Sequence, residues 1–169
     1  MNKKSTACYW IEKLQLSEHP EGGYYRETYR SDMTVDLLMG FNGSRSISSA
    51  IYFLLDGHQF SALHRIKSDE IWHFYTGSPI ILYVLENKKV MTIMLGNDLE
   101  KGERFQSIVK AGSWFGAIVS DCSSYSLMGC TLSPGFDFRD FELGERNKLI
   151  QMYPEHKAII EKLTKNTGS

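Results

Sequence analysis

The sequence predicts an all-β sandwich or barrel with a short helix at each end. Between about residues 47 and 132 the chain is a series of short apolar runs, with turn residues after roughly every 8–12 positions. No helical stretch separates these runs, which excludes a parallel sheet with crossover helices. Helical periodicity occurs only near the two ends of the chain.

The N-terminal elements come first. Residues 6–16 carry apolar side chains at three-and-four spacing, which predicts a short amphipathic helix; its face is formed by Ala7, Trp10, Ile11 and Leu14. Pro20 and the Gly22–Gly23 pair then break the helix and predict a turn. The run from Tyr24 to Tyr29 is rich in strand-favouring residues, so we expect a strand there.

The strand-like runs that follow are, in order, ISSAIYFLL, FSALHRI, EIWHFY, IILYVL, VMTIML, RFQSIV, SWFGAIV and SYSLMGCTL. After them the chain passes through FDFRDFELG and ends in a helical pattern. Pro154 suits the first position of that helix, because its missing N–H would have no partner there. Its expected apolar stripe consists of Ala158, Ile159 and Leu163.

Length and composition indicate one ordinary globular domain spanning residues 1–169. The chain has 19 Lys and Arg against 20 Asp and Glu, so it lacks the basic excess of a nucleic-acid-binding protein. No apolar stretch has the form of a secretory signal or the length of a membrane span. We therefore expect a cytoplasmic protein with neither nucleic acid nor membrane as a partner.

The three cysteines are Cys8, Cys122 and Cys130, and no two of them form a CxxC pair. Cys122 and Cys130 are able in principle to form a disulfide. Reduced, buried thiols are the interpretation we favour for a cytosolic chain. A tetrahedral cysteine zinc site is not readable from this spacing.

Ionisable residues concentrate in the stretch SALHRIKSDEIWHFYTG, residues 61–77. His64 lies near the end of one strand, and Glu70 begins the next with Trp72 and Phe74 on its own face. His73 falls on the opposite face unless a bulge intervenes. Such groups are costly inside a small barrel unless they are paired, so they mark the expected pocket.

Here the chain resembles the cupin superfamily. Its first motif has two histidines, a glutamate and a glycine; His64, Glu70 and Gly77 match it, but Ile66 stands in the place of the second histidine. Of the second motif only Gly112 remains, and Phe115 stands where its histidine belongs. Two of the four metal-ligand positions thus lack a donor atom. We expect no cofactor and no metal, with His64 and Glu70 as weak candidates should a divalent metal bind.

Five segments resemble more specifically the fifth cupin family, a branch of unassigned biochemistry: EGGYYRETYRS, SSAIYFLL, LHRIKSDEIWHFYTG, AGSWFGA and GCTLSPGFDFRDFEL. The resemblance implies a double-stranded β-helix, or jelly roll, that is commonly dimeric. It also implies a pocket like those of sugar-nucleotide epimerases. Phe115 stands where many relatives have a polar residue, which implies that this wall of the pocket is more apolar.

The expected site combines the motif positions with their neighbours. His64, Glu70 and Tyr125 are the expected catalytic residues, with His64 as base, Glu70 orienting it, and Tyr125 or Tyr52 as acid. The expected ligand-binding residues are Tyr25, Arg26, Thr28, Tyr52, Arg65, Trp72, His73, Phe74, Trp114 and Phe115. Arg26 and Thr28 either line the pocket rim, where a guanidinium grips a carboxylate or phosphate, or belong to a solvated edge strand. His19, His58 and His156 are expected to lie outside the site.

The leading functional hypothesis is a barrel that binds a small polar metabolite, with metal-independent isomerisation or epimerisation of a sugar or nucleotide-sugar as its chemistry. One alternative is a metal-dependent enzyme with a reduced site, and the other is a non-enzymatic ligand-binding or structural dimer. We expect a homodimer, because the edge segment GYYRETYRS is aromatic and β-prone. We also expect His64 and Glu70 to serve ligand binding rather than folding.

Overall fold

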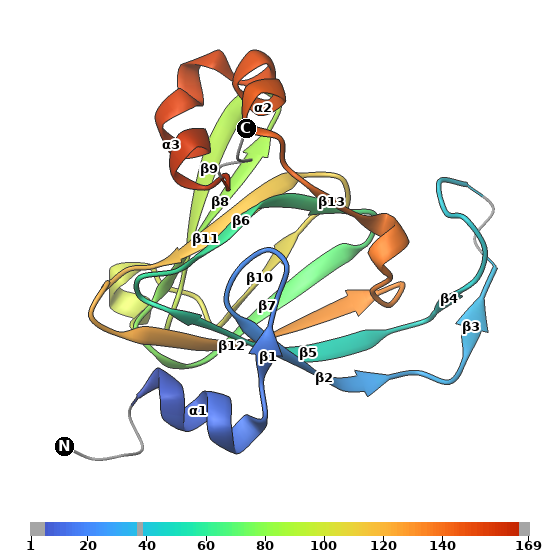
Figure 1. Ribbon diagram of the computed structural model, residues 1–169, viewed down its shortest axis with the longest axis horizontal. Helices are drawn as coiled ribbons and strands as arrows, with labels where there is room; N and C mark the ends of the chain where they lie inside the picture. Colours follow the sequence, from blue (N-terminus) through green and yellow to red (C-terminus); the bar gives the residue numbers. More distant parts are fainter. Residues whose placement is uncertain (1–5, 37–38, 166–169) are drawn as a thin grey trace.

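Two antiparallel sheets face each other in the computed structural model, which describes residues 6–36 and 39–165 (Figure 1). The basic start of the chain lies outside the described residues. The six-stranded sheet has the order β1 (Ser17–Glu18), β2 (Tyr24–Arg30), β5 (Ser49–Asp56), β12 (Tyr125–Ser133), β7 (Asp69–Gly77) and β10 (Gln106–Val109). The five-stranded sheet has the order β13 (Phe141–Leu143), β6 (Phe60–Ile66), β11 (Trp114–Val119), β8 (Ile80–Glu86) and β9 (Lys89–Leu95).

This arrangement is a double-stranded β-helix, and it confirms the predicted fold class. Each strand-like run of the sequence became a strand, with bounds that differ by a few residues. Short 3₁₀ turns lie between strands, at η2 (Leu99–Lys101) and η3 (Phe138–Asp140). The sequence missed the very short strands β1 and β13 and a two-stranded arm, β3 (Thr34–Val35) with β4 (Arg45–Ser46), because two or three residues carry no readable period.

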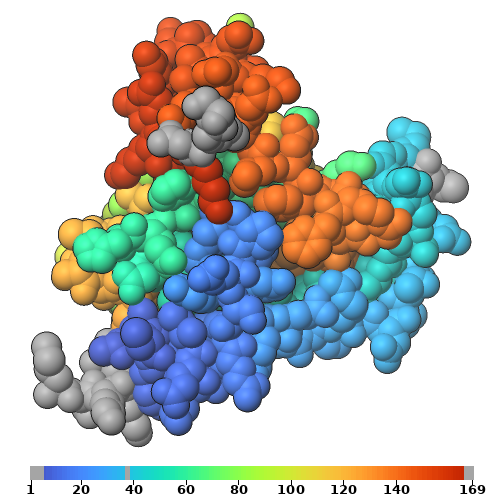
Figure 2. Space-filling view, in the orientation of Figure 1, coloured from blue at the N-terminus to red at the C-terminus, as the bar shows by residue number. Residues whose placement is uncertain are grey.

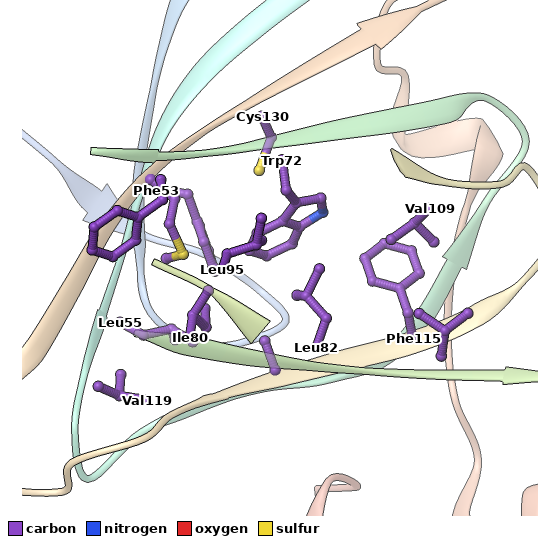
Figure 3. Packing of buried hydrophobic residues seen from close by; sticks show 14 of the residues in the cluster. Phe53, Leu55, Trp72, Ile80, Leu82, Leu95, Val109, Phe115, Val119 and Cys130 are labelled. Atoms are coloured by element: carbon purple, nitrogen blue, oxygen red, sulfur yellow. The ribbon is translucent and has the colours of Figure 1, made fainter. Parts of the chain in front are cut away.

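The core lies between the two sheets. Alternate residues of each strand point inward, so that Phe53, Trp72 and Cys130 of one sheet meet Leu82 and Phe115 of the other (Figure 3). All five side chains are at most 1% exposed. The polar groups described below therefore lie in a wall of tightly packed apolar side chains.

Helix α1 (Ala7–Leu14) packs on the outer face of the six-stranded sheet, against Leu54, Tyr125 and Leu127. The Thr6 side chain caps it by accepting a hydrogen bond from the Tyr9 amide at 3.3 Å. The apolar face that the sequence predicted is the face that packs.

The C-terminal segment differs in detail from its prediction. It forms α2 (Arg146–Met152), a 3₁₀ turn η4 (Pro154–His156) and α3 (Lys157–Lys162), which cover the outer face of the five-stranded sheet. Ala158 is exposed, and Ile160 instead joins Leu163 in the core. The predicted stripe was therefore wrong at Ala158, whereas the partly buried Ile159 packs against the same cluster as Leu163. Pro154 begins a 3₁₀ turn rather than the helix itself, which starts at Lys157. Among the residues that the structure describes, no helix has the length and apolar content to cross a membrane.

The exposure of two of the cysteines contradicts the expectation of buried thiols. All three are free thiols, but only Cys130 is buried, whereas Cys8 and Cys122 are exposed. Cys8 lies on the short amphipathic helix α1 and Cys122 in a surface turn after β11, and neither position is covered by another element. Of the three thiols, Cys130 alone therefore reaches the interior of the barrel.

An arm formed by β3 and β4 is tied to the barrel through Arg45. Its buried guanidinium donates two hydrogen bonds to Asp140 of η3, at 2.6 and 2.9 Å. A third donor nitrogen contacts three backbone carbonyls, including that of Asn42 at 2.8 Å. This contact fixes the segment from 134 to 143, which carries Phe136 and Phe141 across one end of the barrel.

Candidate active site

A narrow pocket of about 30 Å³ lies in the barrel between the two sheets. Its lining is apolar except for three ionisable side chains and one thiol, and consists of Glu21, Ile51, Phe53, His64, Ile66, Glu70, Trp72, Cys130, Leu132, Phe136 and Phe141. Of these residues only Ile51, Phe136 and Phe141 are partly exposed, so they mark the side from which solvent reaches the pocket. A space this small accommodates one or two water molecules.

Strand β7 supplies one polar wall of the pocket. Glu70 and Trp72 point inward, two residues apart, whereas His73 points outward and lies 3.2 Å from the Thr131 hydroxyl. The period-two alternation of the sequence predicted this division. Glu70 Oε2 and Trp72 Nε1 are both buried, and neither atom has a hydrogen-bond partner among the residues that the structure describes.

Burial raises the pKa of Glu70 to about 7. A positive charge on the nearby His64 would oppose this shift, and a negative charge on Glu21 would add to it, but burial is the largest cause. The Trp72 indole N–H and the Cys130 thiol both face the carboxyl and lower that pKa, although the indole N–H makes no well-formed hydrogen bond with it. Near neutral pH the carboxyl is therefore poised between its two protonation states.

The second polar wall comes from the turn that precedes β2. The Gly22 amide donates to the His19 carbonyl at 2.9 Å, and the Ala62 amide of β6 donates to the Glu21 carbonyl at 2.9 Å. Gly22 has φ +116°, and a Cβ on it would lie 2.2 Å from the Phe60 carbonyl oxygen. Only glycine permits this close approach, which carries the Glu21 carboxyl against β6.

A bulge in β6 completes the wall. The register between β6 and β11 shifts between Ser61 and His64, so both side chains reach the same carboxyl. Ser61 Oγ donates to Glu21 Oε1 at 2.7 Å, and Glu21 Oε2 lies 3.2 Å from His64 Nε2. His19 Nδ1 lies 3.4 Å from the same Oε2 atom. Figure 2 shows the blue segment that carries this turn packed beside the orange chain near residue 140.

His64 is enclosed on every side. Its Nδ1 lies 2.7 Å from the Ala62 carbonyl oxygen, and its ring packs on Phe115 with 4.1 Å between centroids. Burial lowers the pKa values of His64 and His19 and raises that of Glu21. All three shifts favour the uncharged form of the group concerned.

The structure brings together some of the predicted site residues and separates others. His64, Glu70 and Trp72 line the pocket, and Phe74, Phe115 and Tyr25 pack in the core around it. The outer face of the six-stranded sheet carries Arg26, Thr28, Tyr52, His73 and Tyr125. Tyr125 there accepts a hydrogen bond from Trp10 Nε1 at 2.8 Å. The outer side of the five-stranded sheet carries Arg65 and Trp114, with the guanidinium 4.6 Å from the indole.

Sequence reasoning missed Glu21 and His19, and it placed His19 outside the site. The His19 side chain instead turns inward, with its ring centroid 4.6 Å from that of Tyr25. One signal was present, because Glu21 directly precedes the glycine pair and opens the segment that resembles the family. A loop residue has no period, however, so its direction was not readable.

The residues around the pocket do not fit a cupin metal site. Ile66 and Phe115 offer no donor atom, and the two nitrogens of His64 face the Ala62 carbonyl and the Glu21 carboxyl. Within residues 6–36 and 39–165, no three His, Cys, Asp or Glu side chains are arranged to hold a metal ion.

Comparisons with known proteins agree with this architecture. The family Cupin_5, described as Cupin superfamily (DUF985), matches residues 8–144. A hypothetical protein from Leishmania major is 38% identical with a TM-score of 0.87, and covers 94% of this chain and 98% of its own. A protein from Shewanella oneidensis is 41% identical with a TM-score of 0.86, with coverages of 95% and 98%. An uncharacterised protein of Saccharomyces cerevisiae is 28% identical over 164 residues, which is 89% of this chain and 82% of that one. The chain therefore belongs to the Cupin_5 family of the cupin superfamily.

Proposed function

We propose that this cupin binds a small polar metabolite inside its barrel and exchanges protons with it through Glu70. One observation carries the proposal: Glu70 Oε2 and Trp72 Nε1 are buried side by side, and neither makes a well-formed hydrogen bond within the part of the chain that the structure describes. An unmade hydrogen bond costs about 1–3 kcal/mol for each buried group. A ligand that binds in the pocket and forms hydrogen bonds with both atoms removes this cost.

The two atoms define what the ligand offers. An indole N–H only donates, whereas a carboxyl that titrates near neutral pH both donates and accepts. A hydroxyl or carbonyl oxygen suits this pair, because it accepts from Trp72 and shares a proton with Glu70. Phe53, Ile66 and Leu132 supply apolar walls for the carbon skeleton. Sugars and other hydroxy-carbonyl compounds meet these requirements.

The chemistry we propose is metal-independent isomerisation or epimerisation of such a compound. Ionised Glu70 removes a proton from the carbon beside the carbonyl group, the C–H bond breaks, and an enediolate forms whose oxygen accepts from Trp72. For isomerisation, Glu70 returns the proton to the neighbouring carbon while the hydroxyl proton passes to the former carbonyl oxygen. For epimerisation, the enediolate turns over in the pocket and Glu70 returns the proton to the other face of the same carbon. No electrons are gained or lost in either case. A pKa of about 7 suits a group that must first accept and then donate.

The geometry assigns roles that differ from the sequence-based hypothesis. Both nitrogens of His64 are engaged, so the base is Glu70 rather than His64. Tyr52 and Tyr125 lie across the sheet from the pocket and are not its acid. A sugar needs more room than about 30 Å³, and we propose that Phe136 and Phe141 move aside to admit it.

A thermal-shift and turnover screen with keto- and aldo-sugars, their phosphates and nucleotide-sugars tests this function. Trp72→Phe keeps an aromatic side chain but removes the N–H together with the pyrrole part of the indole, so it should weaken binding by about tenfold. Glu70→Gln should retain binding and lose turnover. Trp114→Phe removes an equally buried, unpartnered N–H on the outer side of the other sheet and should change neither.

Three results would separate this function from its alternatives. Binding that depends on Trp72 without turnover of any compound would favour the non-enzymatic ligand-binding cupin. Turnover that appears only with added divalent metal would favour the reduced-site metal enzyme. Equal effects of Trp72→Phe and Trp114→Phe on binding would show that the pocket is not the site.

A further inference from the structure

We infer that Glu21 carries a proton that it donates to His64, and that Glu21 and His19 are positioning residues which hold His64 neutral behind the pocket. The location of the proton follows from hydrogen-bond geometry together with the burial of the cluster. Its consequence for catalysis rests on the function proposed above, because it leaves Glu70 as the group that exchanges protons with a ligand.

The first step concerns His64. Its Nδ1 lies 2.7 Å from the Ala62 carbonyl oxygen, which can only accept, so Nδ1 carries a hydrogen. In a neutral imidazole the other nitrogen then has a lone pair. That nitrogen, Nε2, lies 3.2 Å from Glu21 Oε2. A hydrogen bond between them requires one proton on either atom.

The second step concerns His19. The Glu21 backbone amide donates to His19 Nδ1 at 3.3 Å, so this nitrogen also presents a lone pair. Glu21 Oε2 lies 3.4 Å from it. One carboxyl oxygen thus faces the accepting nitrogens of two imidazoles. The other oxygen, Oε1, already accepts from Ser61 Oγ at 2.7 Å.

A protonated Oε2 satisfies this arrangement with a single hydrogen. It donates to the nearer nitrogen, that of His64, while Oε1 remains the acceptor for Ser61. A carboxylate beside two neutral imidazoles would instead place three lone pairs together in a buried space. The acid form therefore makes the cluster of His19, Glu21, Ser61 and His64 electrically neutral.

The surroundings favour this neutral state. Burial raises the pKa of Glu21 and lowers those of both histidines. The other titratable groups that influence the cluster are Glu70 and Cys130 inside the barrel and Lys165 at the surface. Lys165 donates to the Pro20 carbonyl at 2.6 Å, and its positive charge opposes protonation of Glu21 and His19. The neighbouring Glu70 has a carboxyl oxygen without a partner in the described part of the chain. When protons are exchanged with a ligand, Glu70 is therefore the buried group whose charge changes.

Long-range ¹H–¹⁵N spectra of the ligand-free, full-length protein at pH 7 test the inference. We expect two different neutral tautomers, with His64 protonated on Nδ1 and His19 on Nε2. The exposed ring of His58 serves as an internal reference for an imidazole in contact with solvent. An imidazolium at His64, or a His19 ring protonated on Nδ1, would overturn the inference.

Glu21→Gln provides a second, independent measurement. An amide N–H replaces the acid O–H as the donor, so both tautomers should persist and Tm should change by only a few degrees. Loss of the Nδ1–H tautomer of His64 in this variant would contradict a protonated Glu21, and if the variant does not fold, the wild-type spectra alone decide. These spectra need no ligand, so a failed metabolite screen would count against the proposed function and leave this inference standing.

Discussion

Glu21 Oε2 lies 3.2 Å from His64 Nε2, and this contact joins the turn before β2 to the bulged strand β6. Neither side chain is more than 8% exposed. The contact closes one wall of the pocket and occupies the nitrogen that a catalytic histidine would use. Opposite it, the carboxyl of Glu70 has an oxygen without any partner. The two carboxyl groups therefore have different surroundings, which is the basis for the different roles that we propose for them.

Glu70→Gln should stabilise the protein at high pH but not at low pH. The pKa of Glu70 rises from 4.5 to about 7 on folding, so below pH 4.5 its ionisation does not affect stability. Between these values the unfolded chain releases a proton that the folded chain retains, and the free energy of unfolding falls. Above pH 7 the fall in the free energy of unfolding is complete and amounts to roughly 3 kcal/mol. Urea unfolding at pH 4 and pH 8 should show a gap between variant and wild type only at pH 8.

Glu103→Gln is the matched control for this measurement. Glu103 is 5% exposed, but its Oε2 accepts a hydrogen bond from the Asp98 amide at 2.8 Å. Its replacement removes a charge-assisted bond and should destabilise the protein at pH 8. If Glu70→Gln were equally destabilising there, Glu70 would be a structural residue and the proposed function would lose its support.

His64→Asn should lower the free energy of unfolding by about 2–4 kcal/mol. The sequence predicts little cost for the loss of either His64 or Glu70, and the contacts of the structure lead us to expect this of Glu70 alone. The shorter side chain loses its packing on Phe115 and leaves Ala62 O or Glu21 Oε2 without a partner. Exposed His58→Asn is the control and should change stability by less than about 0.5 kcal/mol. Similar chemical-denaturation curves for the two variants would refute this prediction.

Metal content should be substoichiometric in protein purified without an affinity tag. Ile66 and Phe115 occupy two ligand positions of the cupin motifs and offer no donor atom. Elemental analysis after dialysis against a chelator should find far less than one iron, zinc or manganese per chain. One tightly retained equivalent would show that the site reorganises around a metal.

The protein should be a homodimer in solution. Within residues 6–36 and 39–165, β1 pairs only with Tyr24 and Tyr25 of β2, and no strand pairs with the outer edge of the rest of β2, which carries Tyr29 at 53% exposure. Tyr29→Lys should weaken self-association in sedimentation velocity runs. The control is Leu99→Lys, at an exposed apolar residue on η2, which should not change association. A wild-type monomer at micromolar concentration would refute the expected dimer.

Much of the fold followed from local patterns. Period-two alternation identified the strands and placed Glu70 and Trp72 on one face with His73 on the other, because successive side chains of a strand point to opposite sides. Period-two alternation does not assign a strand to one sheet or the other. The packing of Tyr125 under α1 and of Trp114 against the C-terminal helices was therefore not predicted.

The sequence by itself determined the strands, the terminal helices and the inward positions of His64 and Glu70. Only the tertiary structure decided that Glu21 and His19 belong to the same site. Their turn is docked by Gly22 against the Phe60 carbonyl, and the bulge in β6 turns Ser61 and His64 toward one carboxyl. Both features depend on contacts between distant segments, where no period in the sequence records the direction of a side chain. The raised pKa of Glu70 is likewise decided by the tertiary structure, because burial by strands from both sheets sets it.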